Sequence, residues 1–160
     1  MIVVADASPI CYLLLIEHVD LLQRLFGQVV IPQAMHDELS AEGAPTIVQT
    51  WIAHPPRWLQ IQYATTTPDA ALGRLHLGER EAITLAGQLK ADLIVLDEKA
   101  ARRVAVECGL YTTGLLGILD EAATRRLIDL PTAIERLPRT TFRASPRLLK
   151  ALLDRHQGTP

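Results

Sequence analysis

The sequence contains few aromatic residues, few cysteines and no excess of basic charge. Aromatic side chains make up 4% of the 160 residues, so aliphatic side chains must supply most of the core within a hydrophobic fraction of 49%. The two cysteines, Cys11 and Cys108, lie far apart and have no CxxC partner. A disulfide framework and a thiolate zinc site are therefore not expected.

The chain also lacks a long uncharged hydrophobic run. Its first residues, Met1–Ser8, contain no basic segment followed by an extended apolar stretch, which a secretory signal would need. No segment approaches the roughly 20 apolar residues of a membrane helix. We therefore expect a cytoplasmic protein that makes no contact with a membrane.

The net charge of −2 argues against a nucleic-acid partner until its distribution is considered. Residues 1–120 contain 8 Lys and Arg against 14 Asp and Glu, whereas residues 121–160 contain 8 against 4. An acidic body with a basic tail suits a cation site beside a phosphate-binding surface, although scattered solvated charges explain the tail almost as well.

Short apolar runs alternate with segments of helical periodicity. Strands are expected at 2–5, 28–31, 58–61, 93–96 and 110–112, and helices at 10–16, 19–26, 33–39, 45–54, 78–90, 98–107, 114–123, 131–137 and 146–155. Residues 65–69 have the composition of a turn. This alternation predicts an α/β domain with a parallel sheet. The segments 10–16 and 19–26 are more apolar than one sheet face needs, which predicts a partner surface there.

Acidic residues follow two of the expected strands. Asp6 comes directly after the first strand and Asp97 directly after the fourth. Ligand sites of open parallel sheets form beyond the carboxyl ends of the strands, so these side chains can converge. Glu38 and Glu81 lie on helices that can reach the same edge. Four converging carboxylates repel one another, and Mg²⁺ or Mn²⁺ would remove that repulsion and support phosphodiester hydrolysis.

Four segments carry these acids in a recognisable order: Val3–Ile10, Ile31–Leu39, Leu77–Ala86 and Ala91–Glu98. In order and spacing they resemble the four acidic motifs of PIN-domain nucleases. The likeness covers about residues 2–120 and is strongest to the VapC-like toxins of prokaryotic toxin–antitoxin pairs. That branch tends to show an Arg after the last acid and a closing Gly-rich turn, which here would be Arg102 and Thr113–Gly117.

The resemblance implies a fold, an activity and partners. The fold would be a three-layer α/β/α PIN-like domain with a central parallel sheet of four to five short strands. A single domain would span 1–160, with a core of about 1–120 and a helical tail of about 121–160. The activity would be that of a Mg²⁺- or Mn²⁺-dependent endoribonuclease that hydrolyses RNA as the toxin of a prokaryotic type II toxin–antitoxin pair. A homodimer and an antitoxin chain are both expected as partners.

The resemblance also assigns residues. Asp6, Glu38, Glu81 and Asp97 would be the catalytic and metal-binding residues. Many PIN domains have an aspartate as the third acid, so whether Glu81 or Glu79 reaches the metal stays open. The residues with a supporting or substrate-binding role would be Ser8, Glu79, Glu98, Lys99 and Arg102. For Ser8, a helix N-cap is an equally good interpretation.

Two other functions remain as alternatives. The first is a phosphatase or phosphoacceptor domain with Asp6 as nucleophile, although Ser8 stands where a DxD motif would have its second acid. The second is a non-catalytic PIN-like module that binds RNA or protein. A dinucleotide-binding domain is excluded because no GxGxxG follows the first strand. The histidines His36, His76 and His156 show no ligand pairing and are expected at the surface or at a partner.

Overall fold

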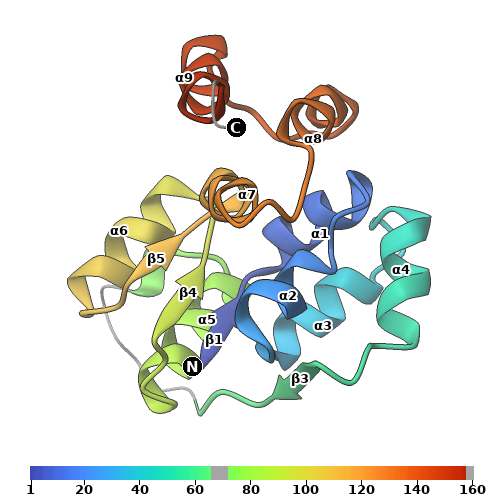
Figure 1. The fold of residues 1–160 in the computed structure, drawn as a ribbon. Helices are drawn as coiled ribbons and strands as arrows, with labels where there is room; N and C mark the ends of the chain where they lie inside the picture. Colours follow the sequence, from blue (N-terminus) through green and yellow to red (C-terminus); the bar gives the residue numbers. More distant parts are fainter. Residues whose placement is uncertain (66–71, 158–160) are drawn as a thin grey trace.

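The computed structural model describes residues 1–65 and 72–157 and arranges them around a parallel sheet (Figure 1). Its strands are β1 (Val3–Ala5), β2 (Val29–Pro32), β3 (Leu59–Gln62), β4 (Leu93–Val95) and β5 (Thr112–Thr113). They lie in the order β3-β2-β1-β4-β5, and all neighbouring pairs are parallel. The sheet thus extends from β1 through β2 to β3 on one side, and β4 and β5 then extend it on the other side of β1. Ligand sites of such sheets form where the strand order reverses, which here is between β1 and β4.

Helices cover both faces of this sheet. They are α1 (Ala7–Leu15), α2 (Leu21–Phe26), α3 (Gln33–Ser40), α4 (Thr46–Ala53), α5 (Leu77–Gln88), α6 (Lys99–Glu107), α7 (Leu115–Thr124), α8 (Leu130–Arg136) and α9 (Pro146–His156), with short 3-10 turns at Leu72–Arg74 and Leu137–Arg139. Several begin at a residue whose side chain accepts a hydrogen bond from the first turn, as helix N-caps do: Asp6, His76, Asp129 and Ser145.

The alternation of side chains along the strands produces two cores. Val3 and Ala5 of β1 face a core that contains residues of α1, α2, α3, α4, α7 and α8. Val4 faces a second core that contains residues of α5 and α6. Because successive strand residues point to opposite faces, one short strand contributes to both cores. The result is the expected three-layer α/β/α arrangement, which is confirmed, with five strands in the sheet.

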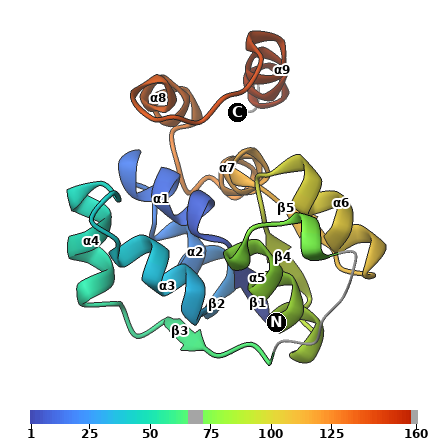
Figure 2. The same cartoon turned by 180° about the vertical axis from the view of Figure 1, so that it is seen from behind.

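The C-terminal helices lie outside this sandwich. Figures 1 and 2 show α8 and α9 beyond α7, on the side away from β3. In α9 the buried residue is Leu152, and Leu148 is 52% exposed. The helical nature of the tail agrees with the sequence, and most predicted elements lie within two residues of the observed ones. The predicted turn at 65–69 falls mainly outside the described residues.

The apolar segments 10–16 and 19–26 contribute much of the core. Ile10, Leu13, Leu21 and Leu22 are at most 2% exposed. α4, α7 and α8 bury them in the first core together with the sheet. A partner surface at these segments stays a prediction. Within the described residues, no helix is long and apolar enough to span a membrane.

Candidate active site

Asp6 occupies the carboxyl end of β1. Its backbone N–H donates to the carbonyl of Val95 at 3.0 Å, which ties the end of β1 to β4. Its Oδ1 accepts the N–H of Ala7 at 2.7 Å and thereby caps α1. Burial raises the pKa of Asp6 to about 7, and the nearby charges of Glu38 and Glu79 add to this increase. Asp6 is 2% exposed, so this carboxylate pays a large desolvation cost when ionised.

Asp97 lies beyond the end of β4. Its Oδ1 accepts the N–H of Leu115, the first residue of α7, at 2.8 Å. A Cβ on Gly114 would lie 2.6 Å from that oxygen, so the approach requires glycine. This contact gives a physical reason for the Gly-rich turn of the sequence motif. The other oxygen, Oδ2, is buried and has no hydrogen-bond partner in the described part of the chain. Burial raises the pKa of Asp97.

Glu38 reaches the same region from α3. Its side chain contributes to the raised pKa of Asp6, which is due first to burial. Its Oε2 lies 3.3 Å from the position that a Cβ on Gly78 would take, so α5 begins directly beside it. The same Cβ would lie 1.9 Å from Cε of Met35. The absence of a side chain at Gly78 therefore permits the close approach of α3 and α5, which both views show side by side (Figures 1 and 2).

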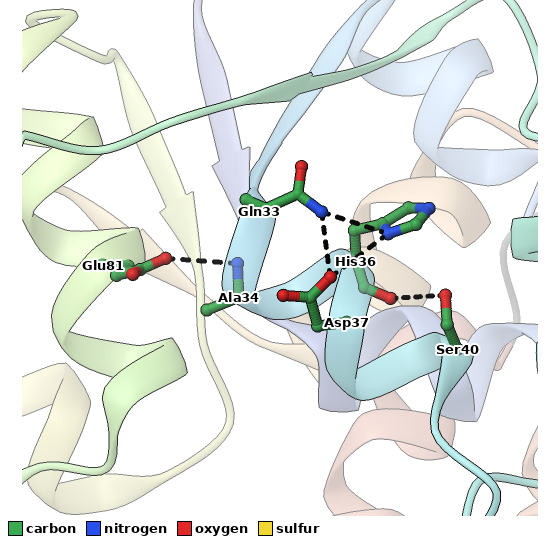
Figure 3. A network of polar contacts seen from close by, with 6 residues as sticks. All are labelled: Gln33, Ala34, His36, Asp37, Ser40 and Glu81. Atoms are coloured by element: carbon green, nitrogen blue, oxygen red, sulfur yellow. Dashed lines mark hydrogen bonds and ion pairs between the residues drawn. The ribbon is translucent and has the colours of Figure 1, made fainter.

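The two candidate third acids point to different places. Glu79 is 5% exposed, and burial raises its pKa; contact with His76 opposes this increase, while Glu98 and Glu38 add to it. Glu81 instead accepts the backbone N–H of Ala34 through Oε2 at 3.1 Å (Figure 3). The charges of Glu79 and Glu38 act on Asp6 and on each other, so Glu79 lies toward Asp6 and Glu38.

The supporting residues lie around this cluster. Ser8 is half-buried and lines a cavity of about 320 Å³ together with Cys11 and Glu38. Glu98 holds the N-cap position of α6 without a side-chain cap bond. Lys99 and Arg102 are exposed on α6. The pKa of Asp97 is raised by burial, and the charge of Arg102 opposes that increase, so this guanidinium lies near the carboxylate.

Sequence reasoning missed His76. Its Nε2 lies 2.5 Å from Oε1 of Glu79, and its Nδ1 accepts the Glu79 backbone N–H at 3.3 Å. The signal was present, because His76 and Glu79 have the spacing of an N-cap residue and the third residue of a helix. His36 contacts Asp37, and His156 contacts Asp120, both away from the acidic cluster.

The comparisons with known proteins identify the family. The family model described as a PIN domain (DUF3368) matches residues 2–158. The chain belongs to the PIN-domain family. This PIN domain is also similar in fold to a solved PilT N-terminus domain protein from the hyperthermophilic archaeon Sulfolobus solfataricus P2, with a TM-score of 0.53 and 18% identity over 91% of this chain and 98% of that chain. No curated protein matches the sequence. PIN domains are generally nucleases, so the chain belongs to a family of nuclease type.

PIN domains typically use divalent metal ions, and the donors of this site can be tested for that use. Within residues 1–65 and 72–157, no three His, Cys, Asp or Glu side chains are arranged to hold a metal ion as they stand. The donor chemistry nevertheless fits, because hard carboxylate oxygens are the ligands of Mg²⁺ and Mn²⁺. The buried, unpartnered Oδ2 of Asp97 is the clearest sign, since a buried carboxylate oxygen without a partner is costly.

Proposed function

We propose that this PIN domain is a Mg²⁺- or Mn²⁺-dependent endoribonuclease whose cation is held by Asp6, Glu38, Glu79 and Asp97. The observation that carries the proposal is the Oδ2 atom of Asp97, which is buried and has no hydrogen-bond partner among the described residues, at the edge where the strand order reverses. Glu79 replaces Glu81 in the proposed ligand set because Glu79 is nearly buried and its charge acts on Asp6, as that of Glu38 does.

Each carboxylate has a defined part in this site. Asp6 and Asp97 are fixed at the ends of β1 and β4, each with one oxygen bound to a backbone N–H. Glu38 and Glu79 approach from α3 and α5. When bound, a divalent cation offsets the negative charge of the carboxylates and of a phosphodiester, and it makes water more acidic. Lys99 and Arg102 would bind the phosphate backbone of the substrate by charge.

RNA as substrate and a role as a toxin with an antitoxin rest on the order and spacing of the acidic motifs. We propose that a second copy or an antitoxin chain packs on a groove between α4, the end of α1 and the loop that follows α1. This groove has a volume of about 560 Å³ and is lined by apolar side chains, one threonine and two acids: Leu14, Glu17, Val19, Asp20, Ile47, Thr50 and Trp51. Ile47 is 50% exposed, so Ile47→Glu should abolish association in a mass measurement at micromolar concentration. An unchanged mass would remove this groove from consideration.

The metal-nuclease proposal is tested by binding and cleavage together. Metal-free protein is titrated with Mn²⁺ by calorimetry, and a pool of single-stranded RNA is incubated with protein and Mn²⁺, with and without chelator. We expect binding and chelator-sensitive cleavage, both lost in Asp97→Asn. The matched control is Asp92→Asn: Asp92 lies before β4 at the opposite edge of the sheet, where its Oδ2 accepts the Ile2 N–H at 2.6 Å. Binding or cleavage that survives equally in both variants would overturn the proposal. Binding without cleavage of any RNA would favour a non-catalytic module.

A further inference from the structure

The imidazole of His76 contacts Glu79 through both of its nitrogens. Nδ1 accepts the backbone N–H of Glu79 at 3.3 Å, and Nε2 lies 2.5 Å from Oε1 of the same residue. A neutral imidazole has one N–H, and a nitrogen that accepts a hydrogen bond does not carry it. The proton therefore lies on Nε2, which donates to the carboxylate. The two contacts together select one tautomer and one ring orientation.

The spacing shows that this contact differs from an ordinary helix start. His76 is the N-cap of α5, and Glu79 is its third residue. In a capping box, a glutamate at that position turns back to the backbone N–H of the N-cap residue. Here the Glu79 carboxylate binds the ring instead. Its side chain is 6% exposed, whereas the His76 side chain is 54% exposed, so the ring holds a nearly buried carboxylate from the surface.

The same arrangement occurs at the two aspartates of the cluster. One oxygen of Asp6 accepts the Ala7 N–H, and one oxygen of Asp97 accepts the Leu115 N–H. In each case a single donor fixes one carboxylate oxygen and thereby orients the other. At Glu79 the His76 ring supplies the corresponding donor. Hydrogen bonds of this kind orient metal ligands and affect metal affinity strongly.

We propose that His76 is a positioning residue of the cation site, whose Nε2–H orients the Glu79 carboxylate toward a bound divalent ion. This inference rests on the proposed function, because it needs Glu79 as a ligand. The competing explanation is that His76 only caps α5. The two roles use different nitrogens: capping needs the acceptor Nδ1, and positioning needs the donor Nε2–H.

Two substitutions separate these roles. His76→Ser keeps a good N-cap acceptor and creates a Ser-x-x-Glu capping box, but it removes the donor to Glu79. His76→Gln keeps an N–H donor with a reach similar to that of Nε2, but glutamine is not among the residues that cap helices well, so it weakens the cap. Ser145→Ala is the control for a lost cap elsewhere, because the Ser145 side chain accepts the Leu148 N–H at the start of α9.

The experiment measures Mn²⁺ affinity of the full chain by calorimetry and melting temperature in chelator. We expect His76→Ser to keep its melting temperature and to bind Mn²⁺ roughly 10- to 100-fold more weakly. We expect His76→Gln to melt at a lower temperature and to bind Mn²⁺ within a few-fold of wild type. Ser145→Ala should lower only the melting temperature.

The results that overturn the inference differ from those that overturn the function. If affinity follows melting temperature across the variants, or if His76→Ser binds Mn²⁺ like wild type, His76 is only a helix cap. In that case Asp97→Asn still abolishes binding and the proposed function stands. If the wild type binds no Mn²⁺, both proposals are wrong.

Discussion

The Glu81 carboxylate accepts a hydrogen bond from the Ala34 backbone N–H at 3.1 Å, although 47 residues separate the two (Figure 3). Ala34 lies in the first turn of α3, whose N-cap position is Pro32 and has no side-chain cap bond. A helix start leaves several N–H groups without partners and favours a nearby negative charge. Glu81 therefore supplies from α5 the acceptor that the local sequence of α3 lacks.

Glu81→Ala should accordingly reduce stability and leave the cation site largely intact. Loss of a partly buried hydrogen bond to a charged acceptor should lower the free energy of unfolding by about 1 to 2 kcal/mol. Urea denaturation in chelator measures this change, and Mn²⁺ calorimetry should show near-normal affinity. Glu79→Gln is the counterpart, with unchanged or higher stability and at least tenfold weaker Mn²⁺ binding. The reverse pattern would restore Glu81 as the third ligand.

The close packing of Gly114 against Asp97 gives a second prediction. In Gly114→Ala, the new Cβ would lie 2.6 Å from Oδ1 of Asp97 and 3.1 Å from the Leu96 carbonyl, so the strand end or α7 must shift. We expect a loss of about 1 to 3 kcal/mol in unfolding free energy and weaker Mn²⁺ binding.

The control for this change is Gly87→Ala. Gly87 lies in α5, and a Cβ there would meet no atom within 4 Å. Alanine should stabilise that helix by about 0.5 to 1 kcal/mol without affecting the site. Equal effects of the two substitutions on Mn²⁺ affinity would show that the Asp97 contact does not depend on Gly114.

The strand-end aspartates were predictable from sequence, whereas the choice of the third acid was not. Asp6 and Asp97 follow apolar runs directly, and parallel strands place their carboxyl ends at one edge. Glu79 lies in the first turn of α5 and Glu81 lies two residues further on, so their directions depend on how α5 is rotated against α3. That rotation is set by the contact of Gly78 with Met35, which joins segments distant in sequence. No local pattern encodes it.

The apolar helices show a similar limit of prediction from sequence. Composition indicated that residues 10–16 and 19–26 had surplus apolar side chains, because one sheet face was assumed to be their only cover. The structure adds α4, α7 and α8 to that cover. The three-layer order followed from the alternation of strands and helices, but the positions of α8 and α9 beyond α7 depend on tertiary packing.

Arg102 should affect RNA cleavage and metal binding in opposite directions. Its charge lies near Asp97, where it opposes the increase in pKa that burial causes. Arg102→Ala removes a cation that competes with Mn²⁺ and attracts phosphate, so Mn²⁺ affinity should stay equal or rise while kcat/KM for RNA falls about tenfold or more. Arg103→Ala, one residue along the exposed part of α6, should change kcat/KM less than threefold. Parallel losses in both variants would indicate a general charge effect instead.

Asp6 should make the stability of the metal-free protein depend on pH. Burial raises the pKa of Asp6 from 3.8 to about 7 in the folded protein, so the folded state binds this proton more tightly than the unfolded state does. The extra stability that protonated Asp6 gives the folded state is fully present below pH 3.8 and is lost as the pH rises toward and through 7. This difference in pKa between the two states corresponds to at most about 4 kcal/mol in the free energy of unfolding. Asp6→Asn cannot ionise, so it should not show this loss.

The measurement is thermal unfolding of wild type and Asp6→Asn in chelator at several pH values. The two proteins should melt at similar temperatures near pH 3.8, the unfolded pKa. The variant should melt at an increasingly higher temperature as the pH rises to about 8, where the wild type ionises a carboxylate that is 2% exposed. Added Mn²⁺ should raise the melting temperature of the wild type near pH 8 and leave that of the variant nearly unchanged, because only the wild type retains the ligand charge. A melting-temperature difference between the two proteins that stays constant from pH 5 to 8 would show that Asp6 does not titrate in this range.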